Sequence, residues 1–261
     1  MSYVWSIGSE LTSAKLNNMQ PIDKARIYAA MMKRNTVPVV MVALGSSTTA
    51  GNGASDAAHS YVNLLAAAIQ TTFPLTSGSS PATRTLAAAV ATPPSANGVQ
   101  MINAGVAGTT SANYITGTTI PQIAALHPSI IFHMIGANDY ANGVAPAIYQ
   151  SNLASQVGAL NTALAAASSI PFIHVLIHTF ARPDIVSPTY PWDQYLTALR
   201  AFGGTDVSRI MVIDQSYAYT SIGIPGLDPY AFKADTLHLN DSGHAFMAEL
   251  IRADLQLTER V

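Results

Sequence analysis

The stretch Val37-Pro-Val-Val-Met-Val-Ala-Leu44, continued by Gly45-Ser46-Ser47-Thr48-Thr49-Ala50-Gly51, decides the fold of this chain. Its first eight residues are almost continuously apolar, which is typical of a parallel β-strand buried on both faces. A turn of glycine and small hydroxyl residues follows. Because ligands gather beyond the carboxyl ends of such strands, Ser47 lies where a nucleophile could act.

Four more apolar runs follow, separated by helical patterns. The predicted strands cover residues 37–44, 99–103, 129–135, 170–179 and 209–214. The predicted helices cover residues 59–71, 145–168, 192–202 and 241–258. This alternation predicts an α/β fold, a three-layer α/β/α sandwich with a central, mostly parallel, five-stranded sheet. The segment 74–97, rich in Ser, Thr, Pro and Ala, is predicted to be a surface excursion.

The composition fits one large folded domain. The chain has 261 residues, of which 49% are hydrophobic and only 10% are charged, against about 25% in an ordinary soluble domain. The net charge of -2 gives no reason to expect a nucleic acid partner. The chain has no cysteine and no apolar run of about 18 residues, and its first residues lack the basic start and apolar core that a signal peptide would have. We expect a soluble protein that is not in a membrane, and the low charge favours an extracellular or virion-associated location.

The first 36 residues differ in charge from the rest. They hold five basic and two acidic residues, a balance of +3, whereas the remainder is acidic. We predict that residues 1–36 form an appendage with a helix over residues 22–33, and that residues 37–261 form the main domain. The alternative is an ordinary leading helix that packs on the domain.

Three further segments carry residues that acyl-transfer chemistry needs. They are Asn103-Ala-Gly-Val-Ala-Gly108, Gly136-Ala-Asn138-Asp139 and Asp235-Thr-Leu-His238. The first two follow predicted strands, and the third precedes the last predicted helix. A serine nucleophile needs a base within hydrogen-bond reach and donors for the negative charge that develops on the substrate. The fold is therefore predicted to bring the four segments to one edge of the sheet.

On these residues the chain resembles the SGNH hydrolase superfamily, the GDSL esterases and lipases, which has a flavodoxin-like fold. The first block of that family, Gly-Asp-Ser-x-Thr-x-Gly, matches residues 45–51 except at Ser46. The glycine of the second block corresponds to Gly108. The Gly-x-Asn-Asp and Asp-x-x-His blocks correspond to residues 136–139 and 235–238. The four blocks follow in order and cover roughly residues 38–257.

The resemblance implies a serine esterase that hydrolyses carboxylic esters through an acyl-enzyme. Ser47 would be the nucleophile, His238 the general base and then acid, and Asp235 the group that orients the imidazole. The backbone N–H groups of Ser47 and Gly108 and the amide of Asn138 would form the oxyanion hole. Neither a cofactor nor a metal is implied, and the chain has no His-Glu-x-x-His or phosphate-binding Gly-x-x-x-x-Gly-Lys motif.

The departure at Ser46 leaves alternatives open. The family's aspartate there organises the nucleophile turn, and a hydroxyl makes fewer hydrogen bonds than a carboxylate. A catalytically silent carbohydrate-binding or phage tail structural protein of the same fold, and a lipase or lysophospholipase, are the alternatives. No long apolar lid is visible, which favours short acyl groups, above all O-acetyl groups on carbohydrate.

Two further predictions concern the site. Asp56-Ala-Ala-His59 has the same Asp-x-x-His spacing and is a rival to the pair near the C-terminus. His178, at the end of a predicted strand, and Arg182 are predicted to line the substrate pocket.

A second, shorter resemblance concerns Trp5-Ser-Ile-Gly-Ser-Glu-Leu-Thr-Ser-Ala-Lys-Leu-Asn17, which is similar to an N-terminal segment of some phage tail fibre proteins. It implies an esterase attached to a phage tail. A homo-oligomer is the other assembly that we consider.

Overall fold

A parallel sheet forms the centre of the computed structural model, which describes residues 21–167, 172–182, 184–185, 187–216, 218, 233–235 and 237–255. The strands are β1 (Pro38–Gly45), β2 (Arg84–Thr85), β3 (Gly98–Gly105), β4 (Ile130–Met134), β5 (Ile173–His178) and β6 (Ile210–Asp214). They lie in the order β2-β3-β1-β4-β5-β6, and every neighbouring pair is parallel. Without the edge strand β2, this is the strand order of flavodoxin-like sheets.

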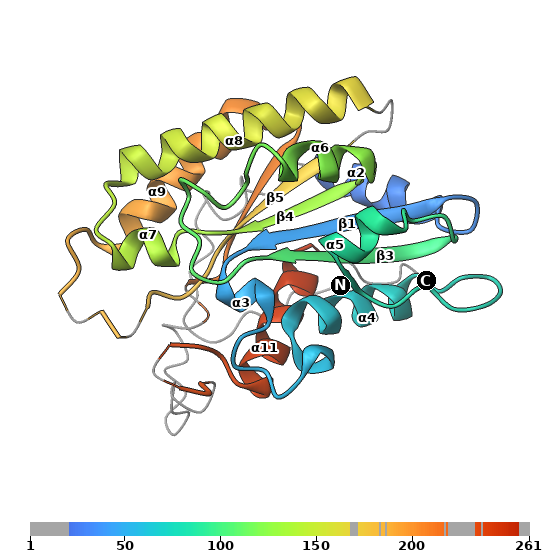
Figure 1. The fold of residues 1–261 in the computed structure, drawn as a ribbon, viewed down its shortest axis with the longest axis horizontal. Coiled ribbons are helices and arrows are strands. Elements are labelled where there is room, and N and C mark those ends of the chain that lie inside the picture. The colour runs from blue at the N-terminus through green and yellow to red at the C-terminus, as the bar shows by residue number, and fades with distance from the viewer. Residues whose placement is uncertain are drawn as a thin grey trace.

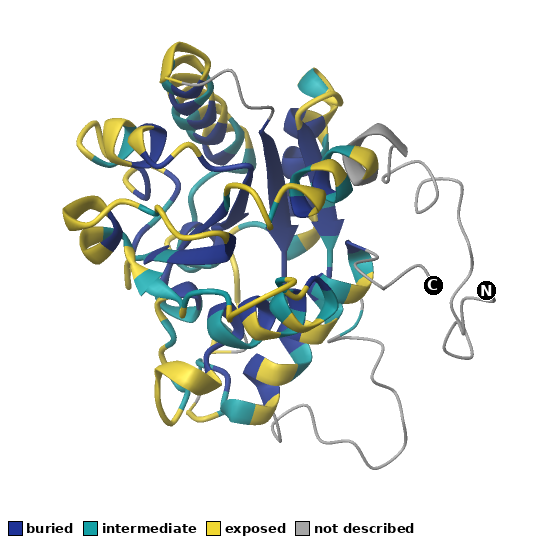
Figure 2. Ribbon diagram, turned by 90° about the vertical axis from the view of Figure 1, so that its right-hand side faces the viewer, coloured by how far each residue is buried: buried dark blue, intermediate teal, exposed yellow. Residues whose placement is uncertain are grey.

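Helices cover both faces of the sheet (Figure 1). One apolar core lies beneath α2 (Pro21–Met32), α4 (Tyr61–Thr72) and α11 (Asp241–Asp254). The other lies beneath α5 (Leu86–Ala91), α6 (Thr119–Ala125), α8 (Pro146–Ala167) and α9 (Trp192–Gly203). The strands are buried between these layers, while the outer helix faces are exposed (Figure 2). The three-layer prediction is confirmed.

The count of five strands is wrong, because the described sheet has six. The additional strand is Arg84–Thr85, which pairs with Ile102 and Asn103 of β3. It lies within the predicted surface excursion, which also contains α5. A strand of two residues has no hydrophobic alternation, so the sequence pattern cannot show it. The predicted longer strands and helices are present, with ends shifted by a few residues.

The leading helix α2 packs on the main domain. Ile27 and Met31 are 1% and 0% exposed and belong to the core that also contains Phe73. The alternative of a packed leading helix therefore fits this part of the chain. Residues 1–20, including the segment similar to phage tail proteins, lie outside the described residues, so an appendage and an assembly with a tail or a second copy stay predictions.

A chain of buried polar side chains runs beneath α8. Tyr114 Oη lies 2.8 Å from His133 Nδ1, and His133 Nε2 lies 2.8 Å from His174 Nδ1. His174 Nε2 lies 2.7 Å from Asn161 Oδ1 on α8. Both histidines are therefore buried residues of the core whose ring nitrogens have hydrogen-bond partners.

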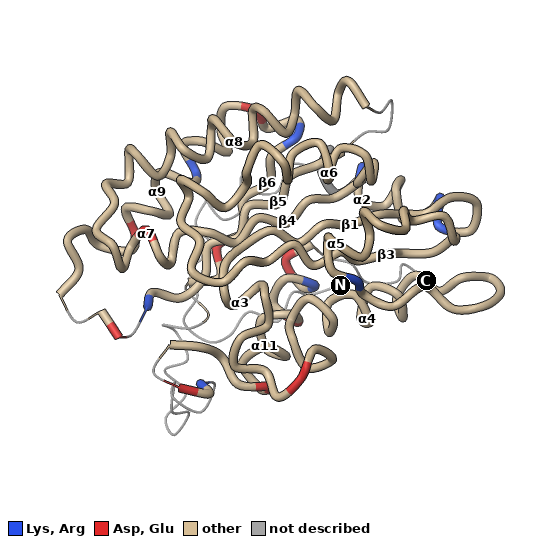
Figure 3. The backbone as a smooth tube through the Cα atoms, in the orientation of Figure 1, with Lys and Arg blue, Asp and Glu red and all other residues tan. Residues whose placement is uncertain are grey.

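Charged residues are thinly spread over the described part of the chain, with long uncharged stretches between them (Figure 3). Within that part, none of the helices combines the length and the apolar character that crossing a membrane requires.

Candidate active site

Three of the predicted site segments follow neighbouring strands. Ser47 comes after β1, Gly108 after β3 and Asn138 after β4. Because β3 and β4 lie on opposite sides of β1, the chain leaves the sheet in two directions at this point. Such a switch point is where parallel α/β sheets form a binding crevice.

Ser47 is the first residue of α3 (Ser47–Ala50), a single helical turn. Ser46 precedes it and makes no side-chain capping hydrogen bond. Close packing holds the turn instead. A Cβ on Gly45 would lie 2.1 Å from Thr49 Oγ1 and 2.5 Å from the Met134 carbonyl oxygen, so only glycine fits there.

A hydrogen-bonded asparagine joins this turn to β3. Asn103 Nδ2 donates to the Thr49 carbonyl over 2.8 Å, and its Oδ1 accepts from the Gly105 N–H over 2.9 Å. This contact fixes the distance between the segments that carry Ser47 and Gly108. Asn103 heads the quoted second block, but the sequence pattern gives no sign of these two hydrogen bonds.

The Asp235–His238 pair is formed. His238 Nδ1 lies 2.9 Å from Asp235 Oδ2, while Oδ1 accepts the N–H groups of Leu237 and His238 at 2.7 and 2.6 Å. The hydrogen bond to the imidazole, followed by those from the backbone, lowers the pKa of Asp235 to about 2. Nδ1 of the imidazole is thus committed to a carboxylate, which leaves Nε2 as the nitrogen for a second partner.

The loop after Ser47 lies against the loop of His238. Asn52 N–H donates to the Ser47 carbonyl, and the Asn52 carbonyl accepts from His244 Nε2 over 3.2 Å. A Cβ on Gly53 would lie 2.2 Å from the Leu239 carbonyl and 2.8 Å from His238 Cβ. The two segments are therefore in van der Waals contact, although within the described chain no hydrogen bond joins Ser47 and His238 directly.

Hydrogen bonds join the two segments that carry the oxyanion-hole candidates Gly108 and Asn138. Asn138, on α7 (Ala137–Ala141), donates from Nδ2 to the Thr109 carbonyl over 2.8 Å. The neighbouring Asp139 is 0% exposed and accepts from Ser111 N–H at 2.8 Å and from Ser111 Oγ at 2.5 Å. Burial raises the pKa of Asp139, and the Ser111 hydrogen bonds oppose that rise.

Gly108 itself is exposed and has a φ of +79°, with open space where a Cβ would be. Its backbone conformation, not crowding, is the reason for glycine here.

Neither His178 nor Arg182 lines the described pocket. Both side chains contact other residues of the protein. His178 is 2% exposed, and its ring stacks on Trp192 with centroids 4.3 Å apart. Burial lowers the pKa of His178 to about 4. Arg182 NH1 donates to Asn138 Oδ1 over 3.0 Å, and Arg182 also binds Asp184. Direct contact of either side chain with substrate stays a prediction.

The rival pair, Asp56 and His59, is also hydrogen-bonded, with 2.8 Å between Asp56 Oδ1 and His59 Nδ1. The same Nδ1 lies 3.2 Å from Ser55 Oγ. The His59 side chain is 51% exposed, against 19% for His238. Ser55 is further bound to Asp241 at the start of α11.

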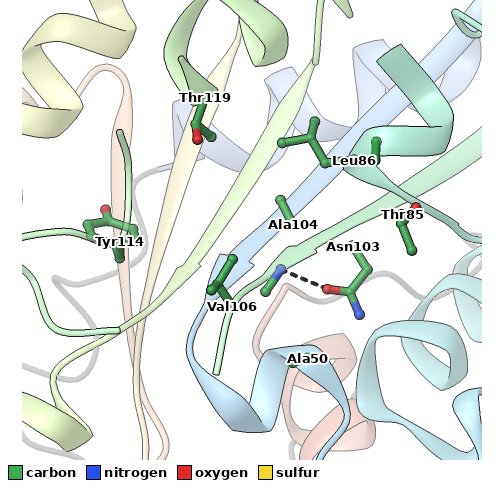
Figure 4. A pocket seen from close by; sticks show the side chains of 10 residues that line it. Ala50, Thr85, Leu86, Asn103, Ala104, Val106, Tyr114 and Thr119 are labelled. Carbon is green, nitrogen blue, oxygen red and sulfur yellow. Dashed lines mark hydrogen bonds between the residues drawn. The ribbon is translucent and has the colours of Figure 1, made fainter. Parts of the chain in front are cut away.

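A pocket of about 280 Å³ begins one helical turn beyond Ser47, at Ala50 (Figure 4). Ser47 itself does not line it. Its walls come from the ends of β2 and β3, the start of α5 and the loop before α6, and they are mostly apolar: Ala50, Thr85, Leu86, Ala87, Asn103, Ala104, Gly105, Val106, Tyr114 and Thr119. Where the structure describes the chain, it groups no three His, Asp or Glu side chains as a metal site would require.

The family model of the GDSL-like Lipase/Acylhydrolase family matches residues 43–246. A comparison with curated protein sequences gives no match. A solved structure of a two-domain esterase (CEX) active on acetylated mannans has 18% identity and a TM-score of 0.59, and the match covers 90% of this chain and 54% of that one. This chain therefore spans about half the length of that esterase.

Two other similar structures match over nearly their whole length. TesA has 18% identity and a TM-score of 0.57, with 83% of this chain and 98% of that chain covered. The psychrotrophic esterase EstA from Pseudoalteromonas sp., inhibited by monoethylphosphonate, has 16% identity and a TM-score of 0.55, with 83% and 96% covered. At these identities the likeness shows a shared fold.

Proposed function

Because the chain belongs to the GDSL-like lipase/acylhydrolase family, we propose that it is a carboxylic ester hydrolase and that Ser47, His238 and Asp235 carry its reaction. The observation that carries this proposal is the hydrogen bond of His238 Nδ1 to Asp235, on a loop that touches the segment of Ser47. It leaves His238 Nε2 for the serine. Hydrogen bonds between catalytic groups are often long before substrate binds, so the missing direct bond is compatible with this role.

In the proposed acylation step, Ser47 Oγ attacks the carbonyl carbon of the ester. His238 Nε2 takes the hydroxyl proton, and Asp235 stabilises the imidazolium. The tetrahedral intermediate then collapses, the C–O bond to the alcohol breaks, and His238 returns the proton to the departing oxygen. The acyl group stays on Ser47. Water then attacks this acyl-enzyme by the same route and releases the carboxylic acid.

Three donors would stabilise the oxyanion of each intermediate: the N–H groups of Ser47 and Gly108, and Asn138 Nδ2. Donors of this kind act because they are fixed before the charge develops, and the loss of one lowers the rate by about 10²–10³-fold. The contacts of Asn138 with Thr109 and of Asp139 with Ser111 support such a fixed arrangement.

The substrate proposed is a short-chain ester, above all an O-acetyl group on carbohydrate. Two observations support this class. The pocket beside α3 is small, about 280 Å³, at the low end of the range for small-molecule sites. A protein of the same fold is an esterase active on acetylated mannans and was co-crystallised with mannopentaose.

Hydrolysis of p-nitrophenyl acetate by the purified protein tests the mechanism. We expect turnover by the wild type and a loss of about 10⁴–10⁶-fold in Ser47→Ala. An alanine variant as active as the wild type would remove Ser47 from the mechanism.

A panel of p-nitrophenyl esters from two to twelve carbons, followed by acetylated mannan and its deacetylated form as control, tests the substrate class. We expect kcat/KM to be greatest at two carbons and to fall with length, and acetate to be released from the acetylated polymer. A maximum at long acyl chains would instead favour a lipase or lysophospholipase.

A further inference from the structure

The side chain of Asn138 is held from two sides. Nδ2 donates to the Thr109 carbonyl over 2.8 Å, and Oδ1 accepts from Arg182 NH1 over 3.0 Å. The Thr109 contact comes from the loop after β3, and the Arg182 contact comes from the segment after β5. Residues from three strand ends therefore meet at this one amide.

These two partners determine which side-chain atom of Asn138 is the nitrogen and which is the oxygen. A guanidinium can only donate hydrogen bonds, so the atom that faces Arg182 must be the oxygen. A backbone carbonyl can only accept, so the atom that faces Thr109 must be the nitrogen. The two constraints agree. One hydrogen of Nδ2 is used by Thr109, and the second is the donor left for a substrate oxyanion.

Arg182 is itself fixed by Asp184. Nε lies 3.1 Å from Asp184 Oδ1, and NH2 lies 2.5 Å from Oδ2, so both carboxylate oxygens are engaged. The Arg182 side chain is only 16% exposed. The hydrogen bonds from Arg182 lower the pKa of Asp184. Because the guanidinium is planar and two of its nitrogens bind Asp184, the direction of its remaining N–H groups is fixed. The ammonium group of a lysine has no such fixed geometry.

We propose that Arg182 is a positioning residue of the oxyanion hole, which holds the Asn138 amide so that its free Nδ2 hydrogen faces the developing charge. The cation also polarises the amide, since hydrogen bonds in a chain strengthen one another. This role rests on the proposed function of Asn138. It differs from the predicted role of Arg182, because the guanidinium acts through Asn138 and does not touch substrate.

Steady-state kinetics of Arg182→Ala on p-nitrophenyl acetate test the proposal. We expect kcat to fall about 10- to 100-fold with KM changed less than about twofold, because a misplaced donor weakens binding of the transition state and not of the ester. Free guanidinium chloride at low concentration should restore part of kcat. Arg252→Ala, which breaks an Arg–carboxylate pair with Glu249 on α11, is the matched control and should leave kcat unchanged.

A double-mutant cycle separates positioning from direct contact. Once Asn138→Ala has removed the amide, Arg182→Ala should cost little more, so the losses should not add. Losses that multiply, or an Arg182→Ala effect found mainly in KM, would overturn the proposal in favour of substrate contact. Wild-type kcat in Arg182→Lys would show that charge alone suffices, and would also contradict it.

One further measurement covers an Arg182→Ala variant that does not fold, and another covers a protein without measurable activity. Asp184→Asn weakens the contacts that hold Arg182 but keeps the guanidinium. It should lower kcat by a smaller factor than Arg182→Ala does. The side-chain amide resonances of Asn138, identified by their loss in Asn138→Asp, should shift in Arg182→Ala. Unchanged resonances would overturn the positioning role whatever the activity, whereas an active Ser47→Ala would overturn only the proposed function.

Discussion

The chain contains two Asp-x-x-His segments that fold into the same hydrogen bond but differ in their surroundings. In Asp56–His59 and in Asp235–His238, a carboxylate oxygen lies 2.8 or 2.9 Å from Nδ1 of the imidazole. The first pair forms a short 3₁₀ turn, η1 (Ala57–His59), on the surface. The second pair closes a loop in which the His238 carbonyl accepts from the Ala234 N–H.

The two pairs differ in which ring nitrogen of the histidine is available to a serine hydroxyl. Ser55 reaches the same Nδ1 of His59 that Asp56 binds, so the serine and the carboxylate compete for one nitrogen. A base that activates a serine needs the carboxylate on one ring nitrogen and the hydroxyl on the other. In Asp235–His238 the carboxylate lies at Nδ1, on a loop that contacts the segment of Ser47, which leaves Nε2 for the hydroxyl. The spacing of two residue types is thus a weaker guide than the position of the pair in the fold.

Replacing each histidine by alanine should give the largest contrast. We expect His238→Ala to lower kcat/KM for p-nitrophenyl acetate by about 10⁴–10⁶-fold, because the serine loses its base, and His59→Ala to leave it unchanged. Steady-state assays of both variants, each checked for folding by circular dichroism, provide the measurement. The reverse result would transfer the catalytic role to the surface pair.

Replacing the carboxylates should give a smaller contrast in the same direction. Asp235→Asn is expected to lower kcat by about 10³–10⁴-fold, because an amide no longer stabilises the imidazolium. Asp56→Asn should match the wild type. The low pKa of Asp235, about 2, means that its carboxylate is ionised in any ordinary assay buffer, so the wild-type pairing is lost only as the pH falls towards that value. Equal kcat values for the two variants would contradict the distinction drawn between the pairs.

The contact between the serine loop and the His238 loop can be disturbed without replacing a catalytic residue. Gly53→Ala adds a methyl group towards the Leu239 carbonyl and His238 Cβ at a φ of +89°. We expect kcat to fall about tenfold and the free energy of unfolding to fall by more than about 1 kcal/mol. Gly78→Ala is the matched control, since it has a φ of +78° and open space around its Cβ. If both variants lose stability and activity equally, the loop contact does not position His238.

The smallest effect concerns the titration of the surface pair. The hydrogen bond from Asp56, with its negative charge, raises the pKa of His59 above 6.5. The pair therefore stabilises the fold fully below pH 6.5 and loses this contribution as the pH rises through the raised pKa. An NMR titration should find the raised pKa of His59 in the wild type and a lower pKa in Asp56→Asn. An unchanged pKa in that variant would remove the ion pair as the cause.

The sequence predicted most of the fold, because long apolar runs and helical periodicity are local signals. It missed the edge strand Arg84–Thr85, whose two residues carry no such signal. For the site, the pairing of Asp235 with His238 is what the family resemblance implied, and the structure contains that hydrogen bond. The family blocks named the remaining site residues, whose catalytic roles stay proposals.

The contacts around Asn138 and Asp139 could not be predicted. Ser111 and Asp139 are 28 positions apart, and Arg182 and Asn138 are 44 apart. Whether such residues meet depends on the conformation of the loops between strands, which hydrophobic patterning does not specify. An arginine and an asparagine in two loops give no signal of their own until the sheet order is known.

The buried polar chain beneath α8 has a consequence for acid tolerance. Asn161 Oδ1 can only accept, so each histidine donates from Nε2 and accepts at Nδ1, and both rings are neutral in this arrangement. Burial lowers the pKa of His174 to about 3 and that of His133 well below its usual value. The unfolded chain takes up these protons as the pH falls through about 6.5, and the folded chain does not, so acid shifts the equilibrium towards unfolding. Acidification should therefore lower the free energy of unfolding at pH values well above those at which the carboxylate of Asp235 is neutralised.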